Sequence, residues 1–219
     1  MIEIINFTQK PLEHIGIVAG TCWGSPLTDS EKNKKRAIEC IDNGHGRVTE
    51  FANVTLVLSE YSARVIREWY THRIGNSNLQ ESTRYVNCND FRYFTPPKIK
   101  SNKKANEIYD SIMKNISDGY GKLIELGIAK EDVANVLPLG METKVVSTLN
   151  LRSLMSMYEV RECTRAYHEY RKVMRELKIA LSTLDEDWKY ICDNYLVAKC
   201  EKLGYCNEKY SCGKFPTKK

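Results

Sequence analysis

Apolar positions follow two different spacings along the chain, and the shorter one predicts strands. Residues 2–5 hold three isoleucines around one glutamate and predict a strand. Residues 51–58 are rich in β-branched and aliphatic side chains and predict another. The apolar residues 15–19 could form one more strand. Around residues 75–78, Gly and Asn predict a loop.

The longer spacing, with apolar residues three and four positions apart, predicts helices. It is clearest between residues 102 and 126, where a long amphipathic helix is expected. Shorter helices are expected at residues 28–42, which open with a capping-type Thr-Asp-Ser-Glu sequence, and at residues 62–71. A second long helix is predicted from about residue 150 to residue 183.

These elements show no regular strand-helix-strand rhythm, which favours an α+β fold over a doubly wound one. We expect a mixed sheet flanked by long helices. The chain contains no internal repeat and no low-complexity linker. Residues 1–219 are therefore expected to form a single domain, with a Cys-rich tail at about 190–219.

The composition is that of an ordinary globular protein, with 42% hydrophobic and 28% charged residues. The first residues lack a basic segment followed by an apolar run, and no apolar stretch approaches the roughly 20 residues that span a bilayer. We expect a cytoplasmic protein without a membrane partner. The net charge of +5 suits an anionic small substrate, although nucleic-acid binding would also produce it.

Eight cysteines in such a chain argue against a disulfide framework. Four of them gather near the C-terminus and could surround a zinc ion: Cys192, Cys200, Cys206 and Cys212. Their spacings are not those of paired CxxC motifs. Reduced thiols without a metal are the alternative.

Residues 71–85 carry the richest candidate chemistry. His72, Arg73 and Arg84 are cationic or can become so, and Gly75 with Asn76 permits a turn. Arginines, hydroxyls and free backbone N–H groups can bind a phosphate monoester or a pyrophosphate. A polar surface loop with incidental arginines is the alternative.

A second candidate lies in the helix predicted to begin near residue 150. On one continuous helix, Asn150, Arg161 and His168 fall within roughly 20° of one another, whereas Arg152 and Ser156 point to another side. Arg161 would lie among apolar residues and would need an anionic partner. That partner is either a ligand or a glutamate in a structural pair, and three glutamates are available: Glu50, Glu60 and Glu68.

A third candidate is His45, which lies between Gly44 and Gly46. Glycines let the backbone approach a ligand closely. An ordinary loop histidine is the alternative.

Taken together, these segments resemble the flavin-dependent thymidylate synthase family over roughly residues 40–175. The family signature is Arg-His-Arg, seven residues, then Ser. Here it appears as Thr71-His72-Arg73 followed, after one extra residue, by Ser82-Thr83-Arg84-Tyr85. The upstream His45…Glu50 segment and the downstream Val136-Leu137-Pro138-Leu139 and Asn150-x-Arg152-Ser153-Leu154 segments are similar to family patterns in the same order.

The resemblance implies conversion of dUMP to dTMP, with methylenetetrahydrofolate as carbon donor and a hydride from NADPH carried by FAD. It also implies a homotetramer with active sites shared between subunits. Positions that contact FAD in the family are occupied by Arg47, His72, Arg73, Gln80, Asn150, Arg152 and Ser156. Positions around dUMP are occupied by Glu68, Trp69, Tyr70, Thr71, Gln80, Glu81, Ser82, Thr83, Arg84 and Arg161.

Within that set the resemblance implies distinct roles for two arginines. Arg84 would hold the phosphate, and Arg161 would be the catalytic residue. A fixed guanidinium near N3 and O2 of uracil favours the ionised ring, which must become electron-rich at C5 before it accepts a one-carbon unit. No cysteine nucleophile is needed for this chemistry.

The chain departs from the family pattern at several positions. Thr71 replaces the first arginine of the signature, Glu68 stands where Gln is usual, and Ala134 replaces an arginine that helps to bind the phosphate. Ser156 and Phe51 replace Asn and His. Compensating cations could come from Arg67, Lys144 or Arg165.

These departures leave two other functions open. One is a related flavin- and folate-dependent modification of another pyrimidine nucleotide, such as reaction of dCMP or hydroxymethylation. The other is a basic nucleic-acid-binding protein, which needs clustered cations and stacking aromatics on one surface. The arginines lie instead in motif loops and in a helix that looks buried, so no nucleic-acid partner is expected.

Overall fold

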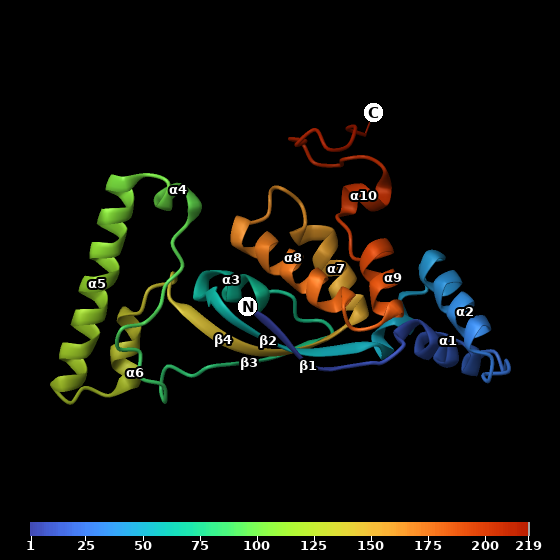
Figure 1. The fold of residues 1–219 in the computed structure, drawn as a ribbon, viewed down its shortest axis with the longest axis horizontal. Coiled ribbons are helices and arrows are strands. Elements are labelled where there is room, and N and C mark those ends of the chain that lie inside the picture. Colours follow the sequence, from blue (N-terminus) through green and yellow to red (C-terminus); the bar gives the residue numbers. More distant parts are fainter. Residues whose placement is uncertain (219) are drawn as a thin grey trace. The chain divides into compact units, whose positions relative to one another are not determined.

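The computed structural model describes residues 1–218. Its sheet contains β1 (Ile2–Phe7), β2 (Asn53–Ser62), β3 (Asn76–Gln80) and β4 (Glu142–Asn150) in the order β1-β2-β4-β3 (Figure 1). Hydrogen bonds from Thr8 N to Asn53 O and from Ser59 N to Met1 O make β1 and β2 antiparallel. Similar bonds make the other neighbours antiparallel too, so the sheet differs in this respect from the mixed one expected.

The helices complete the α+β class that the sequence predicted. They are α1 (Pro11–Cys22), α2 (Ser30–Asp42), α3 (Ala63–Trp69), α4 (Pro97–Lys100), α5 (Lys103–Glu125), α6 (Lys130–Val133), α7 (Leu151–Arg161), α8 (His168–Ser182), α9 (Glu186–Asn194) and α10 (Lys199–Leu203). Two 3₁₀ helices, η1 (Gly46–Phe51) and η2 (Ala134–Val136), lie between them. Within residues 1–218, every helix is too short or too polar to cross a membrane.

The chain, for which one domain was expected, divides into two compact units. Unit 1 contains Met1 and residues 58–71 and 78–146, and unit 2 contains residues 2–57, 72–77 and those from 147 onward. The first and last residues of β2 belong to different units, and the same is true of β4. Each of these strands therefore runs from one unit into the other.

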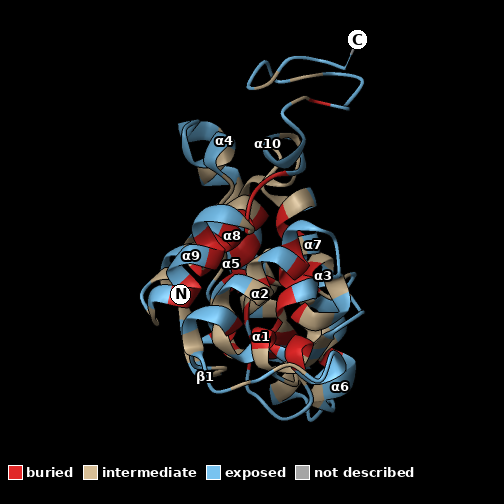
Figure 2. Ribbon diagram, turned by 90° about the vertical axis from the view of Figure 1, so that its right-hand side faces the viewer, coloured by how far each residue is buried: buried red, intermediate tan, exposed pale blue. Residues whose placement is uncertain are grey.

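Unit 2 has a helical core. In Figure 2 the inward sides of α1, α7, α8 and α9 are coloured as buried. Tyr158, Tyr170, Leu177 and Trp188 have no exposed surface. The Tyr158 hydroxyl donates to the Met174 carbonyl at 2.7 Å, which ties α7 to α8 and satisfies a buried polar group.

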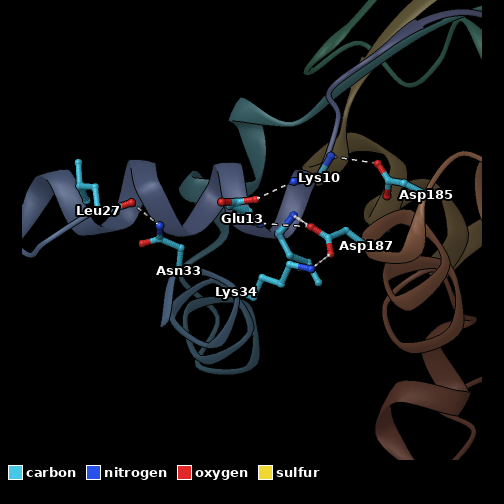
Figure 3. Close-up of polar contacts among 8 residues, drawn as sticks. Lys10, Glu13, Leu27, Asn33, Lys34, Asp185 and Asp187 are labelled. Atoms are coloured by element: carbon cyan, nitrogen blue, oxygen red, sulfur yellow. Dashed lines mark hydrogen bonds and ion pairs between the residues drawn. The ribbon is translucent and has the colours of Figure 1, made fainter. Parts of the chain in front are cut away.

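Asp187 joins three helices of this unit (Figure 3). One carboxylate oxygen accepts from the backbone N–H groups of Leu12 and Glu13 at 3.2 and 3.3 Å, and so caps the start of α1. The other lies 2.9 Å from Lys34 Nζ on α2. Asp187 is 4% exposed, so these contacts form a buried charge network.

Unit 1 has its own smaller core around α5, made of Cys88, Tyr120, Val133 and Met141. Ile108 and Ile112 on the same helix are exposed. The amphipathic pattern of α5 is therefore only partly buried by its own unit.

Most predicted elements are confirmed. The strand at residues 2–5 and the helices at 28–42, 62–71 and 102–126 are present as β1, α2, α3 and α5. Side-chain caps define three of the helix starts: Asp29, Ser62 and Asn102 each accept a backbone N–H. The strand predicted at residues 51–58 begins two residues later, at Asn53, and continues to Ser62.

The strand considered at residues 15–19 is wrong, because this segment belongs to α1. Gly16 permits close packing of α1 against α2, which favours a helix over a strand for this segment. A Cβ atom at Gly16 would lie 1.8 Å from the Asn33 carbonyl oxygen, so α1 meets α2 where no side chain fits between them.

The long helix predicted from 150 to 183 is also wrong, because residues 162–167 separate α7 from α8. His168 was expected to share one helix face with Asn150 and Arg161. This expectation does not hold, because His168 begins a separate helix, α8. Of the expected loop at residues 75–78, Gly75 lies in a turn, whereas residues 76–78 form the start of β3. The sequence analysis missed β4 altogether, although alternate residues of this strand are buried.

Candidate active site

Arg161 at the end of α7 is the centre of one cluster in unit 2. Its Nε atom donates to His72 Nε2 at 3.0 Å, and its guanidinium carbon lies 4.6 Å from the centre of the Tyr170 ring. The His72 and Tyr170 rings meet edge to face at 6.2 Å. Tyr170 is fully buried, so it gives the guanidinium a rigid aromatic surface on which to rest.

His72 is held in its neutral form in this cluster. Burial, followed by the neighbouring positive charge of Arg161, lowers the pKa of His72 from 6.5 to about 4. Because Nε2 accepts the hydrogen bond from Arg161, the imidazole proton belongs on Nδ1. A neutral imidazole can accept this hydrogen bond and so helps to orient the Arg161 guanidinium.

The depressed pKa of His72 predicts a loss of stability in mild acid. Between pH 6.5 and 4 the unfolded chain binds a proton that folded His72 does not, so the free energy of unfolding falls as pH falls through this window. We expect about 1–2 kcal/mol, reduced from the full shift because the ring is only half-buried. Urea unfolding at several pH values measures the slope, and His72→Gln is expected to remove its share. An NMR titration showing His72 protonated at pH 6.5 would contradict this assignment.

A tight turn brings the signature segment to the start of α7. Gly75 has φ of 68°, and its carbonyl accepts from Asn150 N at 2.9 Å. A Cβ atom at Gly75 would lie 2.3 Å from the Asn150 side-chain amide. Asn150 Oδ1 in turn accepts from Ser153 N at 2.9 Å and caps α7. Asn150 therefore links the turn at Gly75 to the first turn of α7.

A second cluster in unit 2 surrounds Arg152. The Arg152 Nη1 atom lies 2.5 Å from Glu50 Oε1. Glu50, which had been considered as a partner of Arg161, thus pairs with Arg152. A cavity of about 420 Å³ is lined by Arg152, Arg47, His45 and Trp23, among others. Gly46 lies beside it, and a Cβ there would be 3.3 Å from Arg152 Nε.

The residues that line this cavity could hold part of a flavin dinucleotide. Arg47 and Arg152 are exposed cations at its wall, suited to a pyrophosphate. Trp23 is 62% exposed and offers a flat apolar surface to an aromatic ring. Ser156, one turn after Arg152 on α7, is exposed as well. The predicted FAD position Arg73 is exposed on the segment that also carries His72.

Unit 1 carries the remaining predicted substrate positions. Glu81 and Thr83 line a cavity of about 400 Å³ together with Arg92 and Lys144. Lys144 had been considered as a replacement for a missing arginine, and its place in this cavity is consistent with that role. Arg92 is already paired with Glu60 at 3.1 Å and with Glu142 at 3.2 Å.

Arg84 lies outside the lining of this cavity. Its Nε is 3.0 Å from Glu131 Oε2, and both side chains are more than half exposed. Such a pair contributes little to stability, so an anion of higher charge can replace the glutamate at small cost. Gln80 is also exposed, and its amide donates to Thr143 Oγ1 at 3.2 Å. Ser82 accepts from Arg84 N at 3.3 Å.

The end of α3 has mainly structural contacts. Trp69 is 1% exposed and donates its indole N–H to Asn78 at 3.0 Å, so its side chain belongs to the core. Burial raises the pKa of Tyr70. The Thr71 hydroxyl donates to the Glu68 carbonyl at 2.6 Å and helps to end the helix. Thr71 therefore replaces a charged residue with a local hydrogen bond.

The zinc grouping considered for the tail is not formed. Cys192 is fully buried, and its thiol donates to the Lys178 carbonyl at 3.6 Å. Among residues 1–218, no group of three or more His, Cys, Asp or Glu side chains is arranged to hold a metal ion. All eight cysteines are free. Cys192 faces the α8–α9 contact because it occupies an apolar position of α9.

Sequence reasoning missed three residues of these clusters: Trp23, Arg92 and Tyr170. One continuous helix was assumed, and on such a helix Tyr170 could not contact Arg161. The break at residues 162–167 instead lets α8 pack beside α7 (Figure 1). The signal that could have found it is the apolar spacing of α8, which restarts after the break.

The fold defines an α+β protein whose candidate site residues include several arginines. A family model for thymidylate synthase complementing protein matches residues 3–183. The flavin-dependent thymidylate synthase of Nitratidesulfovibrio vulgaris is 30% identical over 98% of this chain and 95% of its own length. The enzyme of that name from Pyrococcus furiosus is 28% identical over 95% of this chain and 89% of its own length.

Solved structures show the same fold. A crystal structure of the flavin-dependent thymidylate synthase ThyX from Helicobacter pylori, complexed with FAD and dUMP, matches with a TM-score of 0.70 and 19% identity. The match covers 89% of this chain and 98% of that one. The chain belongs to the thymidylate synthase complementing protein family, and its curated relatives are flavin-dependent thymidylate synthases.

Proposed function

We propose that this protein is a flavin-dependent thymidylate synthase that converts dUMP to dTMP, with methylenetetrahydrofolate as carbon donor and NADPH as reductant. The observation that carries the proposal is the fixed Arg161 guanidinium between neutral His72 and buried Tyr170. It occurs in a chain that matches the family model over most of its length.

FAD, when bound, supplies the hydride that completes the methyl group. Arg47 and Arg152 would hold its pyrophosphate, since both line one cavity of unit 2. Exchange of Glu50 for a phosphate oxygen at Arg152 replaces one anion by another. His72, Arg73, Gln80, Asn150 and Ser156 remain proposed FAD contacts.

Arg161 would act on the uracil ring. The pyrimidine must lose its N3 proton to become electron-rich at C5, and a nearby fixed cation stabilises the resulting anion. His72 cannot share the positive charge, because its pKa of about 4 keeps it neutral at physiological pH. Tyr170 restricts the guanidinium from one side, so the charge needs no reorganisation during the reaction.

The dUMP phosphate would be bound by Arg84, with Glu81, Ser82 and Thr83 beside it in sequence. Lys144 lines the same cavity as Glu81 and Thr83, which supports it as the cation that offsets Thr71 and Ala134. The proposed contacts at Glu68, Tyr70 and Thr71 come from the end of α3. A contact at Trp69 would have to use its backbone.

We further propose a homotetramer with active sites shared between subunits. The signature segment leaves large apolar side chains exposed: Ile74 by 88%, Leu79 by 75% and Tyr85 by 77%. A neighbouring subunit that covers them would remove this surface from water. Eight free cysteines are typical of a reducing compartment and favour the cytoplasm.

A spectroscopic experiment tests the proposed function. The purified protein is expected to be yellow, with a flavin spectrum that NADPH bleaches and dUMP perturbs. With methylenetetrahydrofolate present, mass spectrometry should find dTMP. Parallel reactions with dCMP and dUMP compare the substrates. A colourless protein that cannot be loaded with FAD would contradict the proposal, and faster turnover of dCMP would overturn the choice of substrate.

A further inference from the structure

The C-terminal tail and the segment after α7 enclose a cavity of about 350 Å³ in unit 2 that is rich in thiols. Four of the eight cysteines line it: Cys163, Cys200, Cys206 and Cys212. Cys163 comes from the break between α7 and α8, and the others come from the tail. Arg161 lines the same cavity.

Cys212 differs from the other three in its surroundings. It is exposed. The nearby Thr164 side chain and then the Lys214 backbone lower the pKa of Cys212, and the Lys214 charge adds to the effect. A thiolate that is both stabilised and open to solvent is the form of cysteine that peroxides oxidise.

Cys163 is the partner that we consider for an oxidised Cys212. Both cysteines line one cavity, and Thr164, which lowers the pKa of Cys212, is the residue next in sequence to Cys163. Cys200 is a poorer partner, because burial and then the nearby Cys163 raise the pKa of its thiol. A protonated thiol attacks slowly.

We propose that Cys212 is a peroxide-reactive modification site and that its oxidation closes a disulfide with Cys163. The Cys212 sulfur attacks one peroxide oxygen, the O–O bond breaks, and the departing hydroxide takes a proton to form water. The Cys163 sulfur then attacks the resulting sulfenic acid, an S–S bond replaces the S–O bond, and a second water leaves with the Cys163 proton. Two thiols and one hydrogen peroxide thus give one disulfide and two waters.

This disulfide would tether the tail to the segment that directly follows Arg161. The tail otherwise has few polar ties to the rest of unit 2, among them the pairs of Lys202 with Glu159 at 2.6 Å and Glu208 with Arg165 at 3.1 Å. Both pairs are partly exposed. Oxidation would replace such weak contacts by a covalent bond.

Peptide mapping of the full-length protein tests the site. Reduced protein is treated with hydrogen peroxide, its remaining thiols are alkylated, and it is digested with trypsin without reductant. The expected product joins residues 162–165 to residues 210–214, and dithiothreitol should separate them. Cys200 and Cys206 fall in different tryptic peptides, so the partner is assigned without ambiguity.

Variants give the test its controls. Cys212→Ser should abolish the linked peptide, whereas Cys22→Ser, which removes another exposed cysteine, should leave it unchanged. Thr164→Val should slow oxidation of Cys212 several-fold. A disulfide between any other pair, or alkylation of Cys22 being blocked by peroxide as fast as that of Cys212, would overturn the proposal. The assay needs neither flavin nor nucleotide, so its result is independent of the proposed synthase activity.

Discussion

Replacing Arg161 with alanine is expected to lower the turnover number for dTMP formation by about 10²–10³-fold while FAD remains bound. Loss of one preorganised group that stabilises developing charge typically has an effect of this size. Arg161 contacts His72 and Tyr170, whereas the proposed pyrophosphate cations, Arg47 and Arg152, line a separate cavity. The measurement is single-turnover dTMP formation beside the flavin absorbance of the same preparation.

Two variants control this experiment. Arg161→Lys keeps the charge but loses the planar fork that rests on Tyr170, so only partial recovery is expected. Lys189→Ala removes an exposed cation on α9, paired with Asp193, and should leave turnover unchanged. Full activity of Arg161→Ala would remove Arg161 from the mechanism, and loss of the flavin would show that its role is in cofactor binding instead.

Replacing Asp187 with alanine is expected to lower the free energy of unfolding by about 3–5 kcal/mol. The substitution leaves the Lys34 ammonium without its buried partner and two N–H groups at the start of α1 without their acceptor. The Asp187 carboxylate raises the pKa of Lys34, as expected for a charge pair that stabilises the ammonium. Urea denaturation followed by circular dichroism measures the change.

The matched variants separate the two roles of Asp187. Asp187→Asn retains an oxygen that can cap α1 but loses the ion pair, and should lie between wild type and alanine. Asp193→Ala removes an exposed carboxylate from the same helix and is expected to leave the free energy of unfolding nearly unchanged. A cost for Asp187→Ala as small as that for Asp193→Ala would contradict the network shown in Figure 3.

Local signals along the chain predicted the elements that depend on local physics. The sequence placed the starts of three helices at residues 28, 62 and 102, and in the structure Asp29, Ser62 and Asn102 cap these helices. Capping is decided within four residues, and an amphipathic repeat such as that of α5 within a few turns. The segment at residues 15–19 could not be resolved in this way, because its helix is favoured by contact between Gly16 and α2.

For the candidate site, too, the sequence predicted the motif residues but not their contacts with distant residues. Motif spacing singled out His72, Arg84, Arg152 and Arg161, because a family signature is a property of the sequence. It could not show that Glu50 pairs with Arg152, since the two residues are 102 positions apart in the sequence. The sequence also grouped Cys192 with Cys200, Cys206 and Cys212, whereas in the structure Cys163 lines a cavity with those three cysteines.

The sequence by itself determined the α+β class, the positions of α2, α3 and α5, the family, and the arginines of the family motifs. Only the tertiary structure decided which groups surround those arginines: a neutral histidine and Tyr170 at Arg161, a glutamate at Arg152, and thiols beside the end of α7. The physical reason is that backbone conformation and helix capping act over a few residues. Burial, pKa values and ion pairs depend instead on groups that the fold brings together from distant positions.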